Sequence, residues 1–181
     1  METGTEDKMI GYRNIRFRIF HMLMLLVMVT IFCFSAQEGT ESSEISNAFL
    51  LWLLDLIGSY ISRGLSLWIT RWIRKLAHFT IYAVLGFFAT GMMVERTRNR
   101  VSNRVTASLP AAAFGGWLIA TGYAATDEFH QLFVPGRSGM FTDVCLDGAG
   151  AAFGVVILLV SWLAGRWLHR GGRRPESRSE E

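Results

Sequence analysis

The chain has 181 residues, 51% of them hydrophobic, with 18 basic and 15 acidic side chains and a formal net charge of +3. The length suits one domain, and the apolar content exceeds what a soluble domain of this size needs, so the composition favours a membrane protein. The basic residues lie next to apolar runs without a groove-reading motif, which argues against nucleic acid as a partner, and Cys33 and Cys145 lack zinc-binding spacing.

The first apolar run covers residues 20–34 and follows the basic stretch YRNIRFR. This charge pattern is typical of a signal peptide or of a first transmembrane helix. Cleavage after Ala36 would place the bulky Phe34 close before the cut, where a small residue is preferred. We therefore predict a transmembrane helix here.

Three more apolar runs cover residues 76–94, 109–126 and 149–165. Each run reaches roughly 20 residues when the polar residues at its ends are included, which is enough to cross a hydrocarbon core of ~30 Å. A further run, 47–58, is too short to span and is interrupted by Asp55, which favours an interfacial or re-entrant helix over a fifth span. The predicted fold is all-α: a polytopic membrane protein with four transmembrane helices and a short interfacial helix in the first outer loop.

Basic residues set the predicted orientation. They gather before the first run, in the connection 95–108 and after the fourth run, and with four spans all three segments lie on one side of the membrane. Both termini are therefore expected in the cytoplasm, and residues 35–75 and 127–144 outside. The predicted division of the chain is a cytoplasmic basic segment (1–18), a membrane domain (19–165) and a cytoplasmic basic, disordered tail (166–181).

Small residues line one face of several runs. They include Gly86 in the second run, Gly116 and Ala120 in the third, and Gly150 and Gly154 in the fourth. Such spacing lets helix backbones approach closely in lipid, where no hydrophobic effect presses helices together. We expect the second, third and fourth runs to form a tight bundle.

Polar residues gather at the outer start of the second run. Arg71, Lys75, His78 and Tyr82 follow one another at steps of four, three and four, with Arg74 beside them. These steps place the four side chains on one stripe of a helix. The stripe begins near the membrane interface and points toward the interior of the predicted bundle.

The other two outer ends carry acids and an amide. The third run ends in Asp127, Glu128 and Gln131, and the fourth begins with Asp143 and Asp147 on the face that bears its small residues. Three helix ends thus present polar groups toward a shared interior. Ionisable residues in membrane segments are functional-site candidates, since lipid does not solvate them.

The turn VPGRSG, residues 134–139, is expected to hold Arg137 over these groups. Taken singly, the polar residues also have plain structural roles: Lys75 as an interfacial anchor, His78 as a packing residue, and Asp143 as a helix-dipole partner. A purely structural network, in which Arg137 and Lys75 neutralise the acids, therefore remains an alternative to a functional site.

Three segments resemble the VanZ-like family of small bacterial membrane proteins: FSAQEGTESSEIS, RKLAHFTIYAVLG and ATDEFHQLFVPGRSGMFTDVCLDGAGAAFG. They follow in family order and cover most of residues 30–155. The chain departs from many relatives at Ile81, where they have an acid. The resemblance implies a bacterial cytoplasmic membrane protein. It also implies an association with resistance to glycopeptide antibiotics, teicoplanin in particular, without removal of the antibiotic's peptide target.

Our main hypothesis is an outward-facing pocket that binds or remodels the head group of a membrane lipid or lipid-linked cell-wall precursor. Arg74, Lys75 and Arg137 would hold its phosphate. The predicted binding residues are Ser35, Gln37, Arg74, Lys75, His78, Tyr82, Asp127, Glu128, Gln131, Arg137, Asp143 and Asp147.

The alternative is an intramembrane enzyme acting on a phospho- or acyl-lipid head group, with Asp127 or Glu128 as base and His78 as acid or base. A variant adds Asp143 and places a divalent ion on these four residues, but we expect neither a metal nor a cofactor. A transporter is disfavoured, because polar groups occupy only one end of the predicted bundle. The sequence leaves the ligand and the oligomeric state open.

Overall fold

The computed structural model describes residues 3–37, 39–57, 63–100 and 105–171. In that part of the chain all regular structure is helical, which confirms the predicted all-α class. The five helices are α1 (Thr3–Ser35), α2 (Gly39–Ile57), α3 (Arg63–Arg100), α4 (Val105–Gln131) and α5 (Phe141–Gly171).

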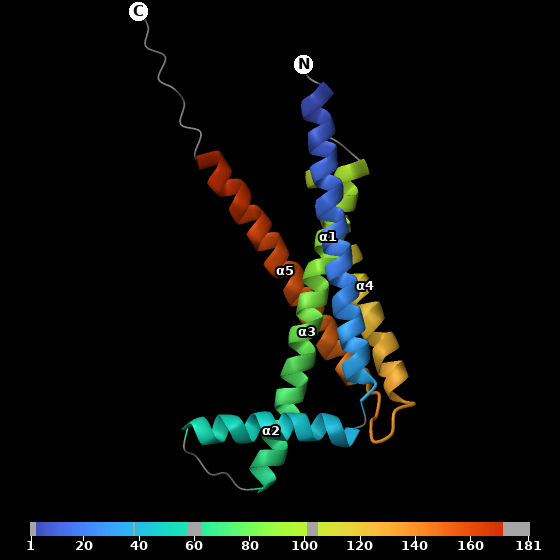
Figure 1. The fold of residues 1–181 in the computed structure, drawn as a ribbon, viewed down its shortest axis with the longest axis vertical. Coiled ribbons are helices and arrows are strands. Elements are labelled where there is room, and N and C mark those ends of the chain that lie inside the picture. Colours follow the sequence, from blue (N-terminus) through green and yellow to red (C-terminus); the bar gives the residue numbers. More distant parts are fainter. Residues whose placement is uncertain (1–2, 38, 58–62, 101–104, 172–181) are drawn as a thin grey trace, which may run out of the picture.

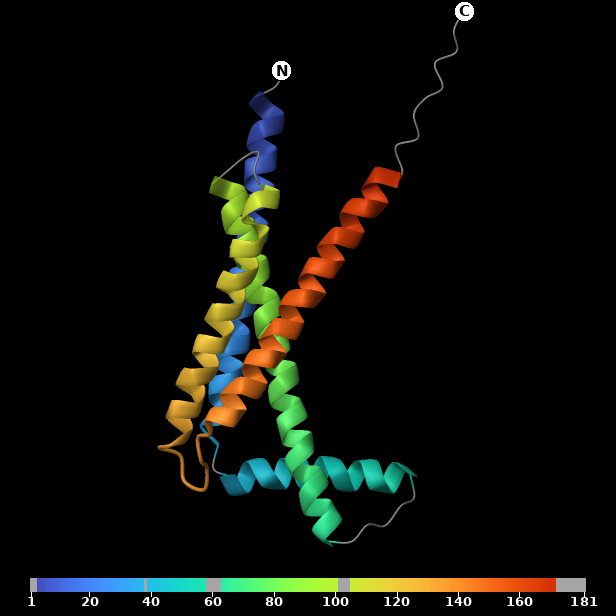
Figure 2. The same cartoon turned by 180° about the vertical axis from the view of Figure 1, so that it is seen from behind.

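α1, α3, α4 and α5 run along the molecule, and α2 lies across them (Figure 1). α1, α3, α4 and α5 alternate in direction, and α2 crosses the bundle at the end where the connection between α4 and α5 also lies. We call this the α2 end. The start of α1 and the end of α5 both lie at the opposite end (Figures 1 and 2).

α3 is the central helix, because it contacts each of the other four. Its small residues allow a close approach to α5: a side chain at Gly86 would overlap the backbone of Ala151, and one at Gly150 or Gly154 would overlap the backbone of Phe79 or Ala83. α4 packs against the other side of α3, where Gly116 touches Thr90. The predicted bundle of the second, third and fourth runs is thus confirmed.

Among the described residues, three helical segments are long and apolar enough to cross a membrane: Asn14–Ser35, Leu65–Arg98 and Phe141–Leu168. α4 is 27 residues long and rich in glycine, alanine and threonine, and it is not one of these three. Large apolar side chains such as Leu26, Phe114 and Val160 remain exposed on the bundle. A lipid-facing surface has this character, whereas monomeric soluble proteins rarely expose such large patches.

Several helices extend beyond the predicted apolar runs, among them α2 and α5. α2 begins at Gly39, well before the predicted apolar start at residue 47, because its first turns are polar and carry no hydropathy signal. α5 continues to Gly171, so residues 166–171 of the predicted tail are helical, and residues 172–181 lie outside the described part of the chain.

Candidate functional site

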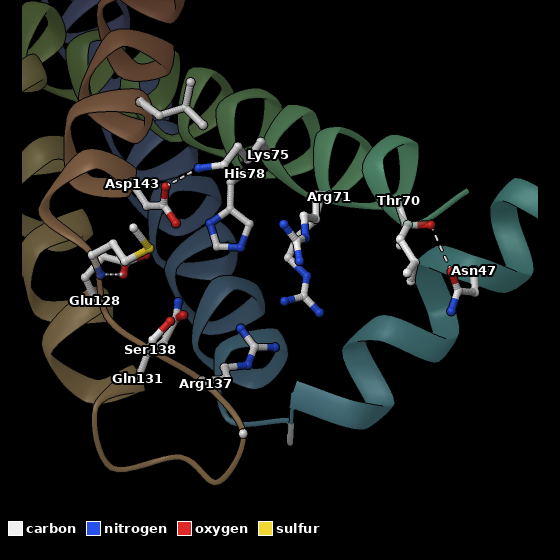
Figure 3. Close-up of a pocket in the computed structure, with 15 residues that line it drawn as sticks. Asn47, Thr70, Arg71, Lys75, His78, Glu128, Gln131, Arg137, Ser138 and Asp143 are labelled. Carbon is white, nitrogen blue, oxygen red and sulfur yellow. Dashed lines mark hydrogen bonds and ion pairs between the residues drawn. The ribbon is translucent and has the colours of Figure 1, made fainter. Parts of the chain in front are cut away.

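The α2 end holds a polar cavity of about 570 Å³ (Figure 3). Its walls come from α2, α3, the end of α4, the α4–α5 connection and the start of α5. The ionisable and amide side chains that line it are Asn47, Arg71, Arg74, Lys75, His78, Glu128, Gln131, Arg137 and Asp143. We call it the polar pocket.

α3 supplies most of the basic groups. Arg71, Lys75 and His78 project from α3 into the polar pocket, as their spacing predicts (Figure 3). Tyr82, one turn further along, does not line this pocket. It is fully buried in the core, next to Asp127 and Asp147. The stripe therefore begins with the exposed Arg71 at the pocket and ends with the buried Tyr82 in the core.

Lys75 forms an ion pair with Asp143, which joins α3 to α5. Both side chains are partly exposed, with 40% and 26% of their surface accessible. Exposed pairs of this kind contribute at most about 1 kcal/mol, so the pair is a weak source of stability. Because Lys75 is already paired with Asp143, it is not an unpaired cation of the pocket.

Three acids lie deeper and are almost inaccessible: Asp127 is 4% exposed, Glu128 5% and Asp147 0%. Gln131 Nε2 donates to Asp127 Oδ2 at 3.2 Å, and the Met140 amide donates to Glu128 Oε2 at 2.9 Å. These bonds fix the orientation of the two α4 carboxylates. Burial raises the pKa of Glu128, and the Met140 amide opposes this by stabilising the carboxylate.

His78 lies beside these acids. Its Nδ1 is 3.6 Å from Asp147 Oδ2, so α3 and α5 meet at an imidazole and a buried carboxylate. One ring nitrogen of His78 and one oxygen each of Asp127 and Glu128 lie within 4.8 Å of one another. The structure thus brings together the three residues considered for catalysis, and the same three could hold a metal ion.

Arg137 lines the polar pocket, as predicted, and two of its donors bind backbone carbonyls of the same chain. Its Nε donates to the carbonyl of Gln37 at 2.9 Å, and its Nη2 donates to the carbonyl of Phe34 at 2.9 Å. The last carbonyls of a helix have no intrahelical partner, and Arg137 satisfies one of them, that of Phe34, together with the carbonyl of Gln37 just after the end of α1. Burial and the nearby Arg74 guanidinium lower the pKa of Arg137.

The α4–α5 connection is also tied to the start of α2. The Gly39 amide donates to the Pro135 carbonyl at 3.1 Å, and Gly136 has a positive φ of 73°. A side chain at Gly39 would overlap the Gly136 carbonyl. The VPGRSG turn therefore connects α1, α2 and α5 through its backbone and Arg137, and the prediction that it lies over the bundle is confirmed.

A second, more apolar cavity of about 240 Å³ adjoins the polar pocket between α1, α2 and α3. We call it the apolar cavity. Its wall includes Ile31, Phe34, Ile45, Ile73 and Ile81. Three side chains border both spaces: Arg74, His78 and Arg137. The predicted binding residues Ser35 and Gln37 line this second cavity and not the polar pocket.

The site lies within the part of the chain that matches a known protein family. The profile of the family described as VanZ/LLP1 matches residues 20–163. The chain belongs to the VanZ/LLP1 family. The match extends over the apolar part of α1 through most of α5 and includes each predicted binding residue, and it confirms the resemblance seen in the sequence motifs. Neither a curated protein nor a solved structure matches the chain.

Within this VanZ/LLP1 chain, the sequence prediction missed several residues of the polar pocket, among them Arg71 and Asn47. Arg71 lines it and is exposed, yet was not among the predicted binding residues although it begins the α3 stripe. Asn47, on α2, accepts a hydrogen bond from Thr70 at 2.9 Å. Spacing alone could have indicated Arg71, whereas Asn47 reaches the pocket only because α2 folds across α3.

Proposed function

We propose that this VanZ/LLP1 chain binds the phosphate-bearing head group of a membrane lipid or lipid-linked cell-wall precursor at the α2 end. The observation that carries the proposal is the pair of adjoining cavities. The polar pocket has cationic side chains, the apolar cavity has isoleucines and a phenylalanine, and Arg74 and His78 border both. An amphiphile with a phosphate next to an alkyl chain has matching chemistry on both sides of that border.

The proposed setting is the bacterial cytoplasmic membrane, with α4 as a fourth span and both termini in the cytoplasm. Basic residues cluster at the end of the bundle where α1 begins and α5 ends, which favours the cytoplasm for that end. α2 exposes Phe49, Trp52 and Leu56 and lies across the bundle, as an interfacial helix does. The polar pocket would then open at the outer leaflet, near lipid phosphates.

Arg71 is the cation best suited to test the proposal. Lys75 is paired with Asp143, and Arg137 holds two backbone carbonyls. Arg71 is exposed at the pocket wall, and no hydrogen bond or ion pair joins it to the described part of the chain. Its removal should therefore change ligand binding without disturbing the fold.

Arg71→Ala is expected to weaken binding of phosphatidylglycerol about tenfold, the effect of losing one charge-assisted hydrogen bond of ~1.5 kcal/mol. The measurement is native mass spectrometry of the purified protein titrated with phosphatidylglycerol, with phosphatidylcholine as competitor. Arg96→Ala is the matched control, since Arg96 is exposed on α3 near its other end. Equal retention of phosphatidylglycerol by wild type and Arg71→Ala would contradict the assignment of this pocket.

The family's association with glycopeptide resistance leads to a cellular expectation. Occupying the head group of a precursor at the outer face would reduce access of teicoplanin to the cell surface. Expression in a sensitive Gram-positive host should then raise the inhibitory teicoplanin concentration several-fold, and Arg71→Ala at equal membrane level should lose most of that gain. Full protection by Arg71→Ala would show that teicoplanin resistance does not depend on ligand binding in the polar pocket.

An enzyme acting on the same head group is the second candidate, and the buried acids next to His78 favour it. In that case Asp127 or Glu128 would serve as base and His78 as acid or base. The same titration distinguishes the two functions: a binding protein releases phosphatidylglycerol unchanged, whereas an enzyme yields a product of different mass that Asp127→Asn fails to form.

A further inference from the structure

The deepest part of the site gathers four groups with metal-ligating chemistry. His78 comes from α3, and Asp127 and Glu128 come from α4, with one ligand atom of each within 4.8 Å of the others. The two carboxylates are 4% and 5% exposed. Because the three groups belong to two helices that pack closely, their approach is set by the fold.

Asp147 supplies an independent observation from a third helix. It is fully buried, and within the described part of the chain neither of its carboxylate oxygens has a hydrogen-bond partner. Its Oδ2 faces His78 Nδ1 at 3.6 Å. A buried carboxylate without hydrogen bonds is rare in folded proteins and points to a partner that completes the site.

The negative charge of this cluster exceeds its positive charge. Asp127, Glu128 and Asp147 bring up to three negative charges into the interior, and His78 offers at most one positive charge. Two neighbouring cations already have partners: Lys75 is paired with Asp143, and Arg137 binds the carbonyls of Phe34 and Gln37. Buried carboxylates need either protons or a cation, because their desolvation is costly.

The α4 carboxylates are also held in place by other residues. Gln131 donates to one oxygen of Asp127, and the Met140 amide donates to one oxygen of Glu128. Each bond leaves the second oxygen for another partner. Metal-ligating carboxylates and histidines typically have such outer hydrogen bonds, which fix the direction of the ligand atoms.

We propose that His78, Asp127 and Glu128 bind one divalent metal ion, with Asp147 orienting His78 or completing the ligand set. One imidazole nitrogen combined with carboxylate oxygens suits Zn²⁺ or Mn²⁺ better than Ca²⁺ or Mg²⁺, which prefer oxygen alone. The ion lies at the inner wall of the polar pocket. The proposal rests on this cluster and does not require the ligand of the pocket to be a lipid.

The test is metal loading of the full-length protein in detergent. After treatment with a chelator, the protein is dialysed against Zn²⁺ or Mn²⁺, and bound metal is measured by elemental analysis on the monodisperse fraction. Wild type should retain about one equivalent. His78→Asn and Glu128→Gln should each lower metal affinity by at least ~100-fold, more than typical outer-shell substitutions do. His130→Gln is the matched control, because that imidazole is on α4 but stacks on Phe32 outside the cluster.

Wild type that retains no metal and shows no rise in melting temperature with either ion would overturn the proposal and leave protons as the neutralising groups. Equal metal retention by wild type and Glu128→Gln would also overturn it. If His78→Asn does not fold, the amounts of metal bound by wild type and by Glu128→Gln still test the proposal. Loss of phosphatidylglycerol preference with metal retained would instead reject only the proposed function.

Discussion

Gly154→Leu is expected to prevent stable assembly of the bundle. Gly154 lies where α5 crosses α3, and even a Cβ atom there would overlap the Ala83 carbonyl and approach the Phe87 amide. Extra side-chain volume in a packed interior costs about 1–3 kcal/mol when side chains can move aside. Here the obstacle is the backbone of α3, so the cost should reach or exceed ~3 kcal/mol. That is a large part of the 5–15 kcal/mol that holds a typical domain together.

The measurement is the fraction of protein that elutes as a monodisperse species in detergent, followed by its melting temperature. Gly165→Leu is the matched control: the glycine is on the same helix and has open space around it. We expect Gly165→Leu to behave as wild type and Gly154→Leu to aggregate or to melt much earlier. Equal melting temperatures for the two variants would mean that α3 and α5 do not pack in this way.

Arg137→Met has the second-largest expected effect. The substitution keeps an unbranched stem as far as the position of Nε but removes the donors to the Phe34 and Gln37 carbonyls. A hydrogen bond from a charged donor contributes about 1.5–3 kcal/mol, and partial exposure reduces this, so we expect a total loss of about 2 kcal/mol. The α4–α5 connection should detach from α1, and the border between the two cavities should open.

Arg137→Lys should not restore stability. Lysine carries a single ammonium group and cannot present the planar fork that reaches two carbonyls at once. Thermal denaturation of the purified variants measures the effect, with Arg71→Ala as control because it removes an exposed guanidinium without described partners. A melting temperature for Arg137→Met equal to that of Arg71→Ala would show that other contacts hold the connection.

Several features of the site could be predicted from the sequence because they depend on a single helix. The spacing of Arg71, Lys75 and His78 places them on one stripe whatever surrounds the helix, and the structure has them in one pocket. The same is true of Gly150 and Gly154, whose spacing indicated the face that meets α3. Local periodicity is a property of the backbone geometry, so it survives folding unchanged.

Pairings between helices could not be predicted in this way. Lys75 forms an ion pair with Asp143, and His78 faces Asp147. The sequence offered no reason to prefer these pairs over Lys75 with Asp147 and His78 with Asp143. Nor did the sequence indicate that Arg137 donates to the carbonyls of Phe34 and Gln37. Such choices depend on the rotation and tilt of each helix relative to its neighbours.

The sequence by itself determined the helical class, the family, the tight packing of α3 with α4 and α5, and the end of the bundle where polar groups gather. Hydropathy and residue spacing carry this information, because lipid and helix geometry constrain every such chain in the same way. Only the tertiary structure decided that Arg137 is an anchor, that Ser35 and Gln37 line a separate apolar cavity, and that His78 meets three buried acids. These contacts join residues far apart in the chain, and they arise from the crossing of helices around α3.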